Sequence, residues 1–187
     1  WEWRQSHWVA LTPTLHPSPR NAAAMAPAPG DKLVLFGGSS GGRETWTLYL
    51  RSDLASATTY GVGCGSPPLH LTADTLPVLG QTQITTVHEV PAGAALMAIG
   101  ASNAALGPFP LPLPLDAFGM PGCQLLQDLG FVAASPCTPM PGGTARYTLA
   151  IPTSPLLIDV EVYLQASASA PGANAAGLVV SDGLHLV

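Results

Sequence analysis

The stretch that decides the fold is Pro17–Leu50, PSPRNAAAMAPAPGDKLVLFGGSSGGRETWTLYL. It predicts three short strands separated by turns. Ala22–Ala26 is a short apolar run, and it is followed by Pro27–Asp31, a dense cluster of turn formers. Lys32–Phe36 is rich in residues that favour strands and stops at a diglycine, where a positive φ costs little. Glu44–Leu50 then alternates between polar and apolar residues, as a half-buried strand does.

Composition narrows the fold class. Only 9% of the residues are charged and 47% are hydrophobic, whereas an average globular chain has roughly 25% charged residues. Twenty Gly and twenty Pro interrupt the chain too often for long helices. An all-β fold is therefore expected. The net charge of −5, with only six Lys and Arg, argues against a nucleic-acid partner. No apolar run approaches the roughly 20 residues that span a membrane.

Beyond about residue 57 the chain shows short strands separated by Gly- and Pro-rich turns. Thr82–Val87 and Ile158–Leu164 alternate with a period of two, as strands with one buried face require. About six to nine such strands in roughly 130 residues indicate an antiparallel β-sandwich. We therefore expect two domains, 1–56 and 57–187. The clearest expected strands are 69–72, 81–90, 94–101, 143–151, 157–165 and 177–181.

Phe109–Leu115 alternates Pro with Leu. Each Pro removes a backbone donor, so a central strand is excluded. We expect an extended segment that covers the sandwich with its Leu side chains on an apolar surface. A proline-rich ligand for another domain is the alternative interpretation.

Four marks stand out in the first 50 residues: Pro19-Arg20, the apolar Ala/Met strand, Leu35-Phe36-Gly37-Gly38 and Thr45-Trp46. Together and in this order they resemble one kelch repeat. The resemblance implies one kelch-like blade, and a single blade cannot close a β-propeller. Trp1–Arg4 and His7–Leu11 are similar to the closing strands of a preceding repeat, at a spacing from Trp46 close to that of kelch-sized repeats. Alternatively, Trp1, Trp3 and Trp8 cap a local apolar cluster.

The remainder of the chain, Tyr60–Val187, carries a series of short Gly- and Pro-containing marks. They are Tyr60–Cys64, Leu76–Gly80, Pro91–Ala94, Ala101–Asn103, Leu111–Asp116, Gly119–Cys123, Pro171–Asn174 and Ser181–Leu184. With these marks the segment resembles a C-terminal module of large secreted proteins of planctomycetes and similar environmental bacteria. The resemblance implies a secreted or cell-surface location, kelch-type repeats upstream and a turn at Ser181-Asp182-Gly183, and it brings no catalytic motif.

The chain has three cysteines, Cys64, Cys123 and Cys137. Cys64 and Cys123 lie in Gly-rich turns that match the module, which suggests a structural disulfide in an oxidising compartment. Cys123–Cys137 is the alternative pairing, and it would leave Cys64 free or bonded to another chain.

No pattern in the sequence predicts a catalytic, cofactor or zinc site. The five histidines are scattered, and no two ligands have the close spacing of a zinc site. No nucleophile elbow or phosphate-binding loop is present. Asp159 and Glu161 are expected on one face of one strand, where they are candidates for a calcium site with loop carbonyls. A solvated strand face is the alternative. We therefore expect a protein that is not an enzyme and has no cofactor.

These features favour a secreted structural protein whose incomplete β unit packs or strand-pairs with neighbouring subunits and builds a filament or surface layer. The alternative is the C-terminal part of a larger kelch propeller that binds a glycan or protein ligand, with the sandwich as an attachment module. The chain opens on Trp1 without an initiator Met, so we expect a processed or partial chain. The expected interface residues are Trp1, Trp3, Trp8, Val9 and Leu11.

Overall fold

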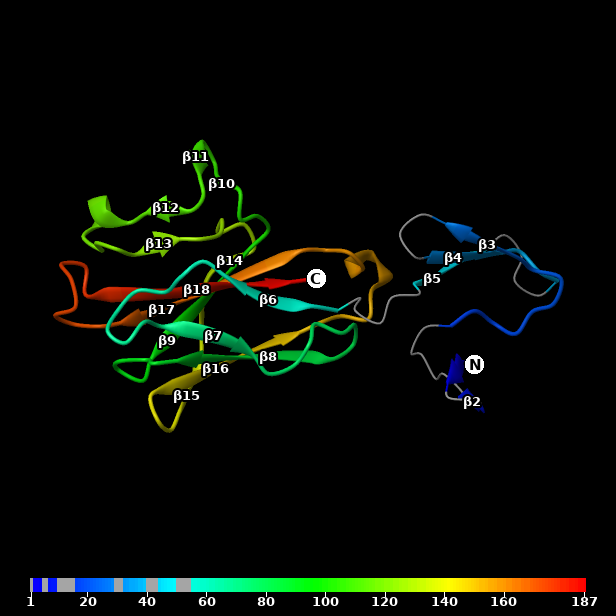
Figure 1. The fold of residues 1–187 in the computed structure, drawn as a ribbon, viewed down its shortest axis with the longest axis horizontal. Helices are drawn as coiled ribbons and strands as arrows, with labels where there is room; N and C mark the ends of the chain where they lie inside the picture. Colours follow the sequence, from blue (N-terminus) through cyan, green and yellow to red (C-terminus); the bar gives the residue numbers. More distant parts are fainter. Residues whose placement is uncertain (1, 5–6, 10–15, 29–31, 40–43, 50–54) are drawn as a thin grey trace. The chain divides into compact units, whose positions relative to one another are not determined.

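The computed structural model describes residues 2–4, 7–9, 16–28, 32–39, 44–49 and 55–187, and within these ranges the protein is all-β, as expected (Figure 1). The only helical elements among these residues are two single 3-10 turns, η1 (Asp116–Phe118) and η2 (Pro155–Leu157). In this part of the chain no helix has the length and apolar character needed to cross a bilayer. The chain divides into two compact units, Trp1–Ser52 and Asp53–Val187.

The first unit contains a hairpin and a three-stranded antiparallel sheet. The hairpin pairs β1 (Glu2–Arg4) with β2 (His7–Val9). The sheet has the order β3-β4-β5, as Pro17–Leu50 predicts. The first strand lies two residues further towards the C-terminus than the predicted run Ala22–Ala26. Pro27 therefore belongs to the strand and not to the turn. Because β3 is an edge strand, Pro27 is tolerated there without a ladder donor. The sheet strands are β3 (Ala24–Ala28), β4 (Lys32–Phe36) and β5 (Thr45–Tyr49).

The second unit is a sandwich of two antiparallel sheets (Figure 1). The five-stranded sheet has the order β14-β9-β17-β18-β6, and the four-stranded sheet has the order β15-β16-β8-β7. Their strands are β6 (Ala57–Tyr60), β7 (His70–Ala73), β8 (Thr82–His88), β9 (Ala95–Gly100), β14 (Val132–Pro136), β15 (Thr138–Met140), β16 (Thr144–Ala150), β17 (Val162–Ser169) and β18 (Leu178–Leu186).

The core lies between the two sheets because alternate residues of each strand point inward. In the four-stranded sheet, Leu71, Val87 and Tyr147 are buried. In the five-stranded sheet, Met97 and Leu164 are fully buried. All five belong to one continuous hydrophobic cluster. This alternation is the period-two pattern that the sequence shows, so the inward face of the sandwich follows from local residue order.

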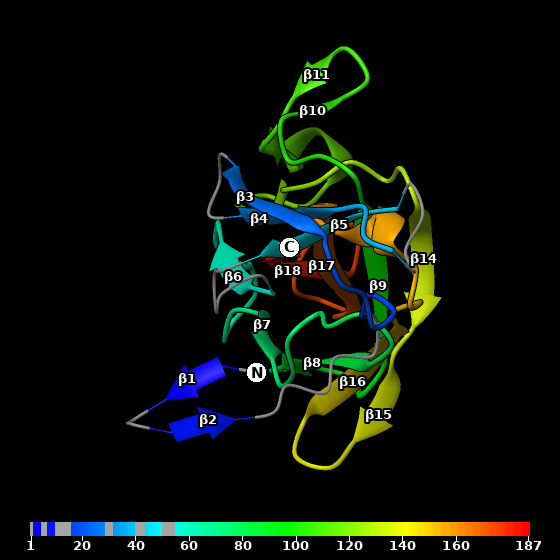
Figure 2. The same ribbon diagram turned by 90° about the vertical axis from the view of Figure 1, so that its right-hand side faces the viewer.

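Residues 101–131 form a further layer over the outer face of the five-stranded sheet. The layer contains two small antiparallel pairs, β10 (Ala105–Leu106) with β11 (Phe109–Pro110) and β12 (Leu113–Pro114) with β13 (Gln124–Leu125). The β10–β11 hairpin stands away from the two sheets (Figure 2). The buried Gln165 amide joins the layer to the sheet: its Oε1 accepts from the Leu126 N–H at 3.0 Å and its Nε2 donates to the Gln124 carbonyl at 2.9 Å.

The proline-rich segment behaves as its composition predicts. It contributes only two-residue strands, and the bond between Leu111 and Pro112 is cis. The side chains of Leu111, Leu113 and Leu115 are half-buried. The segment is therefore part of the covering layer, whereas Phe109 is exposed at its outer end.

Two predictions at the end of the chain are wrong. The strand expected over 157–165 begins only at Val162, because η2 and a left-handed Asp159, with φ of 63°, occupy the residues before it. Asp182 lies within β18 and not at a turn. Its carboxylate accepts the N–H of Leu71 at 2.8 Å, and this bond across to β7 holds the residue in an extended strand.

Candidate functional site

The three-stranded sheet of the first unit has one face made entirely of apolar side chains. In the strand register, Met25, Leu35 and Trp46 form one cross-strand row. Pro27, Leu33 and Leu48 form the next row on the same face, because residues two apart along a strand point the same way. We call these six residues the apolar face.

The apolar face has no second layer within its own sheet. None of the residues described in 16–28, 32–39 and 44–48 is buried. Met25 is 60% exposed and Leu48 is 53% exposed. A sheet with a hydrophobic face is stable only when that face packs against another element. The apolar face is therefore a candidate interaction site.

A hydrogen-bond network fixes the loops at one end of this sheet. The Arg20 guanidinium donates to the Glu44 carboxylate at 2.8 Å and to the Gly37 carbonyl at 3.0 Å. The indole N–H of Trp46 donates to the same carboxylate at 3.1 Å. These hydrogen bonds, first from Arg20 and then from Trp46, lower the pKa of Glu44 below its usual 4.5. The network sets the orientation of Trp46 on the apolar face.

Three of the interface residues expected from the sequence, Trp3, Trp8 and Val9, belong to the N-terminal hairpin. The backbones of Trp3 and Trp8 are paired across it, and Val9 ends β2. Trp1 and Leu11 lie outside the described residues. The sequence did not point to the apolar face as a site. The usable signal was the alternation of Leu33 with Leu35 and of Trp46 with Leu48.

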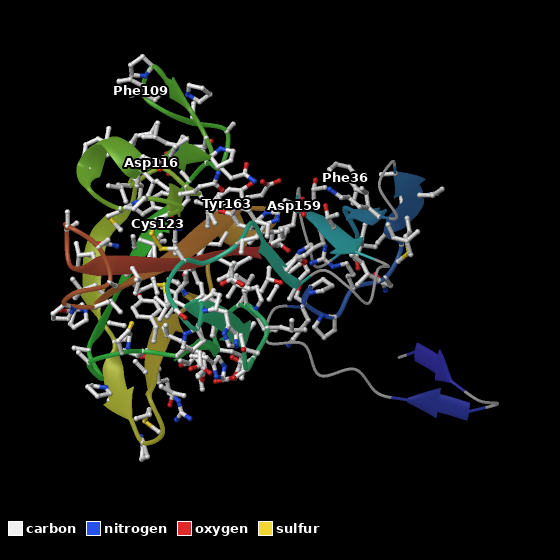
Figure 3. The ribbon with its side chains drawn as sticks, turned by 60° about the vertical axis from the view of Figure 1, so that its left-hand side comes forward. Phe36, Phe109, Asp116, Cys123, Asp159 and Tyr163 are labelled. Carbon is white, nitrogen blue, oxygen red and sulfur yellow. A yellow bond between two sulfur atoms is a disulfide. The ribbon has the colours of Figure 1, made fainter. Side chains whose placement is uncertain are left out.

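The cysteines adopt the first of the two expected pairings. Cys64 and Cys123 form a disulfide with 59 residues of sequence separation, visible at the labelled Cys123 in Figure 3. Cys64 is held at the sheet because its N–H donates to the Val180 carbonyl at 2.9 Å. The disulfide therefore ties the covering layer, which contains Cys123, to the sandwich. The Cys123–Cys137 pairing does not occur.

Cys137 is a free, buried cysteine between β14 and β15, and its N–H donates to the Ala95 carbonyl at 2.9 Å. Burial raises the pKa of its thiol to about 11. Because the thiolate is the reactive form, the thiol is inert near neutral pH.

A cluster of polar side chains lies on the outer face of the five-stranded sheet, around the labelled Tyr163 in Figure 3. The rings of Tyr163 and His185 stack with centroids 4.6 Å apart, and the Tyr163 hydroxyl donates to the Glu161 carboxylate. Burial, together with that hydrogen bond, raises the pKa of Tyr163 to about 12. Tyr60 meets Tyr163 edge-on at 6.0 Å, and burial also raises its pKa. Both phenols keep their protons near neutral pH, so this cluster holds no nucleophile or base among its tyrosines.

A second cluster lies where β7 meets β8. His70 and His88 are paired across the strands and stack with ring centroids 4.6 Å apart, and His88 Nε2 lies 2.8 Å from the Thr72 hydroxyl. Burial raises the pKa of the nearby Asp182, while the Leu71 N–H and the two histidines lower it to a smaller extent. The histidine pair therefore joins β7 to β8, and the Leu71–Asp182 hydrogen bond joins β7 to β18.

The expected calcium pair is not assembled. Asp159 and Glu161 precede β17 rather than lying along one strand, and the Glu161 carboxylate is engaged by Tyr163. Among the described residues, no group of three or more His, Cys, Asp and Glu side chains is arranged to hold a metal ion.

An apolar pocket of about 180 Å³ opens at one end of the sandwich. It lies between the end of β16, the segment that carries η2, and the ends of β17 and β18. Its walls are fixed by backbone bonds: the Gly80 N–H donates to the Ile151 carbonyl at 2.9 Å, and Ser56 and Val187 exchange two bonds. Aliphatic side chains line it, including Leu79, Leu149, Ile151, Val160, Val162 and Leu186.

The fold and these surfaces define an all-β protein that joins a small sheet with one unpaired apolar face to a disulfide-bonded β-sandwich. Comparison of the chain with protein-family models, curated proteins and solved structures finds no significant match. The functional inference below therefore rests on the geometry of this chain.

Proposed function

We propose that the protein is a secreted, non-catalytic structural protein that assembles with neighbouring copies of itself. The observation that carries the proposal is the apolar face. Six apolar side chains in two cross-strand rows are presented on a sheet that contains no buried residue among those described. A sheet of this kind is stabilised when a neighbouring subunit covers it.

The disulfide and the low content of charged residues support an extracellular assembly. The disulfide between Cys64 and Cys123 is typical of oxidising compartments. A chain with only 9% charged residues leaves much apolar surface for contacts with other subunits. If such a contact is head-to-tail rather than two-fold symmetric, it generates filaments or layers.

Sizing and electron microscopy of the full chain test the proposal. We expect concentration-dependent particles larger than the 19.1 kDa monomer. The variant Leu48→Gln places an amide on the apolar face and should reduce assembly, whereas Leu129→Gln, at another exposed leucine, is the matched control. A monomer at every concentration, with Leu48→Gln indistinguishable from the wild type, would contradict the proposal.

A second candidate function is the terminal part of a larger kelch-like propeller that binds a glycan or protein. Arg20, Gly37 and Trp46, three of the kelch-like marks, meet in one network around Glu44, which favours a blade-like unit. Intact mass and N-terminal sequencing of native material discriminate between the two functions. Further blades ahead of Trp1 favour the propeller, and their absence favours self-assembly.

A further inference from the structure

Exposed aliphatic side chains flank, in sequence, the residues that line the apolar pocket at the end of the sandwich. Four large aliphatic side chains adjacent in sequence to lining residues are exposed: Leu76, Val78, Leu156 and Ile158. Leu156 is 86% exposed. Soluble proteins rarely concentrate aliphatic side chains at one place without a binding partner.

The size and chemistry of the pocket select an apolar guest. An apolar cavity of about 150 Å³ holds a benzene molecule, so a pocket of about 180 Å³ accommodates one large apolar side chain. Its walls offer side chains such as Leu149, Val162 and Leu186, which form no hydrogen bonds. A polar or charged group would lose its hydration there without compensation.

The two units carry net charges of opposite sign. Residues 1–52 hold five Lys and Arg against three Asp and Glu, whereas residues 53–187 hold one Arg against eight Asp and Glu. Two copies that contact each other through their acidic sandwiches would repel each other. A sandwich of one copy and the N-terminal sheet of another attract each other, and such complementarity speeds association and selects the partner.

We infer that the apolar pocket is the docking site for a second copy of this chain, which inserts side chains from its own apolar face. This inference rests on the proposed function and names the surface that receives the neighbouring subunit. The contact is heterologous: each copy offers the apolar face to one neighbour and the pocket to another, so it propagates head to tail.

The small area of the apolar face limits the affinity of a single contact. Three strands about 4.8 Å apart and five residues long present roughly 240 Å², well below the roughly 800 Å² per partner of a stable interface. A single contact is therefore weak, with insertion into the pocket supplying much of its affinity. Assembly should appear only at high protein concentration, and loss of one inserted leucine should weaken it at least about tenfold.

A mixing experiment with two variants of the full chain tests the docking site. Leu48→Gln impairs the apolar face, and Ala150→Phe fills the pocket from an exposed position on its wall. Ala105→Phe, at an exposed alanine of the covering layer, is the control for Ala150→Phe. Circular dichroism and thermal unfolding establish that each variant is folded.

The expected result is specific to a head-to-tail contact. Wild type and Ala105→Phe form oligomers, and each impaired variant alone is monomeric at the same concentration. An equimolar mixture of Leu48→Gln and Ala150→Phe forms dimers and nothing larger, because one intact face meets one intact pocket. If Ala150→Phe assembles like the wild type, the pocket is not the docking site, although the proposed function stands. A monomeric wild type would overturn both.

Discussion

Removal of the Cys64–Cys123 disulfide should destabilise the sandwich about as much as a large-to-small substitution in its core. The bond closes a loop with 59 residues of sequence separation. In the chain-entropy model a loop of this length stabilises the folded state by about 4 kcal/mol at 25 °C. The unit that contains it spans Asp53–Val187, and a unit of this size has an unfolding entropy of about 280 cal/mol/K. The expected fall in Tm is therefore about 15 °C.

Calorimetry of two variants measures this effect cleanly. Cys137→Ala serves as the background because it removes the free thiol and prevents disulfide exchange. The triple variant that also carries Cys64→Ala and Cys123→Ala is compared with it. Thiol titration of the unfolded wild type without reductant should count one free thiol per chain. A difference in Tm of less than about 5 °C between the two variants, or a count of three free thiols in the wild type, would refute the reasoning.

Three further predictions concern single residues of the sandwich. Burial raises the pKa of Asp182 above its usual 3.8, so the ionised carboxylate opposes folding at pH 7. The variant Asp182→Asn still offers an acceptor to the Leu71 N–H and should therefore raise Tm at pH 7. This gain should vanish below pH 3.8, where the wild-type carboxyl is protonated in both states. Equal Tm values at pH 7 would contradict it. Gly183→Ala should cost about 1–3 kcal/mol in urea unfolding, because a Cβ there would lie 2.3 Å from Tyr60 Cζ; an unchanged midpoint would show that the ring moves freely. Iodoacetamide at pH 8 should modify Cys137 far more slowly in the native protein than in guanidinium, since its pKa is about 11, and similar rates would rule out its burial.

Local sequence patterns were sufficient to predict the fold class and most strands. Lys32–Phe36 is a strand both in the prediction and in the structure, because β-forming residues end there at a diglycine. Thr82–Val87 shows the same agreement within β8, since its alternation reflects one buried face.

Features that depend on distant partners were not predictable in this way. Asp182 was expected at a turn because the resemblance to the secreted module implies one at Ser181-Asp182-Gly183, but its carboxylate accepts the Leu71 N–H across 111 positions. The strand expected from Leu157 starts later because η2 intervenes. Such contacts leave no periodic signal in the sequence.

The candidate site was only partly visible in the sequence for the same reason. Trp46 stood out as a kelch-like mark, and the Leu33–Leu35 alternation was present. The register that places Met25, Leu35 and Trp46 in one row depends on how the strands pair. Only the three-dimensional arrangement shows that the row has no covering layer in its own sheet.

The central claim is that a neighbouring subunit covers the apolar face. Hydrogen exchange of the full chain at low and high protein concentration tests it most directly, with peptides from β4 and β5 as reporters and β17 as the internal reference. The account predicts that protection of β4 and β5 amides rises with concentration while β17 amides, held in the sandwich, exchange slowly at both. Full protection of β4 and β5 in a dilute monomer, or none at any concentration, would contradict it.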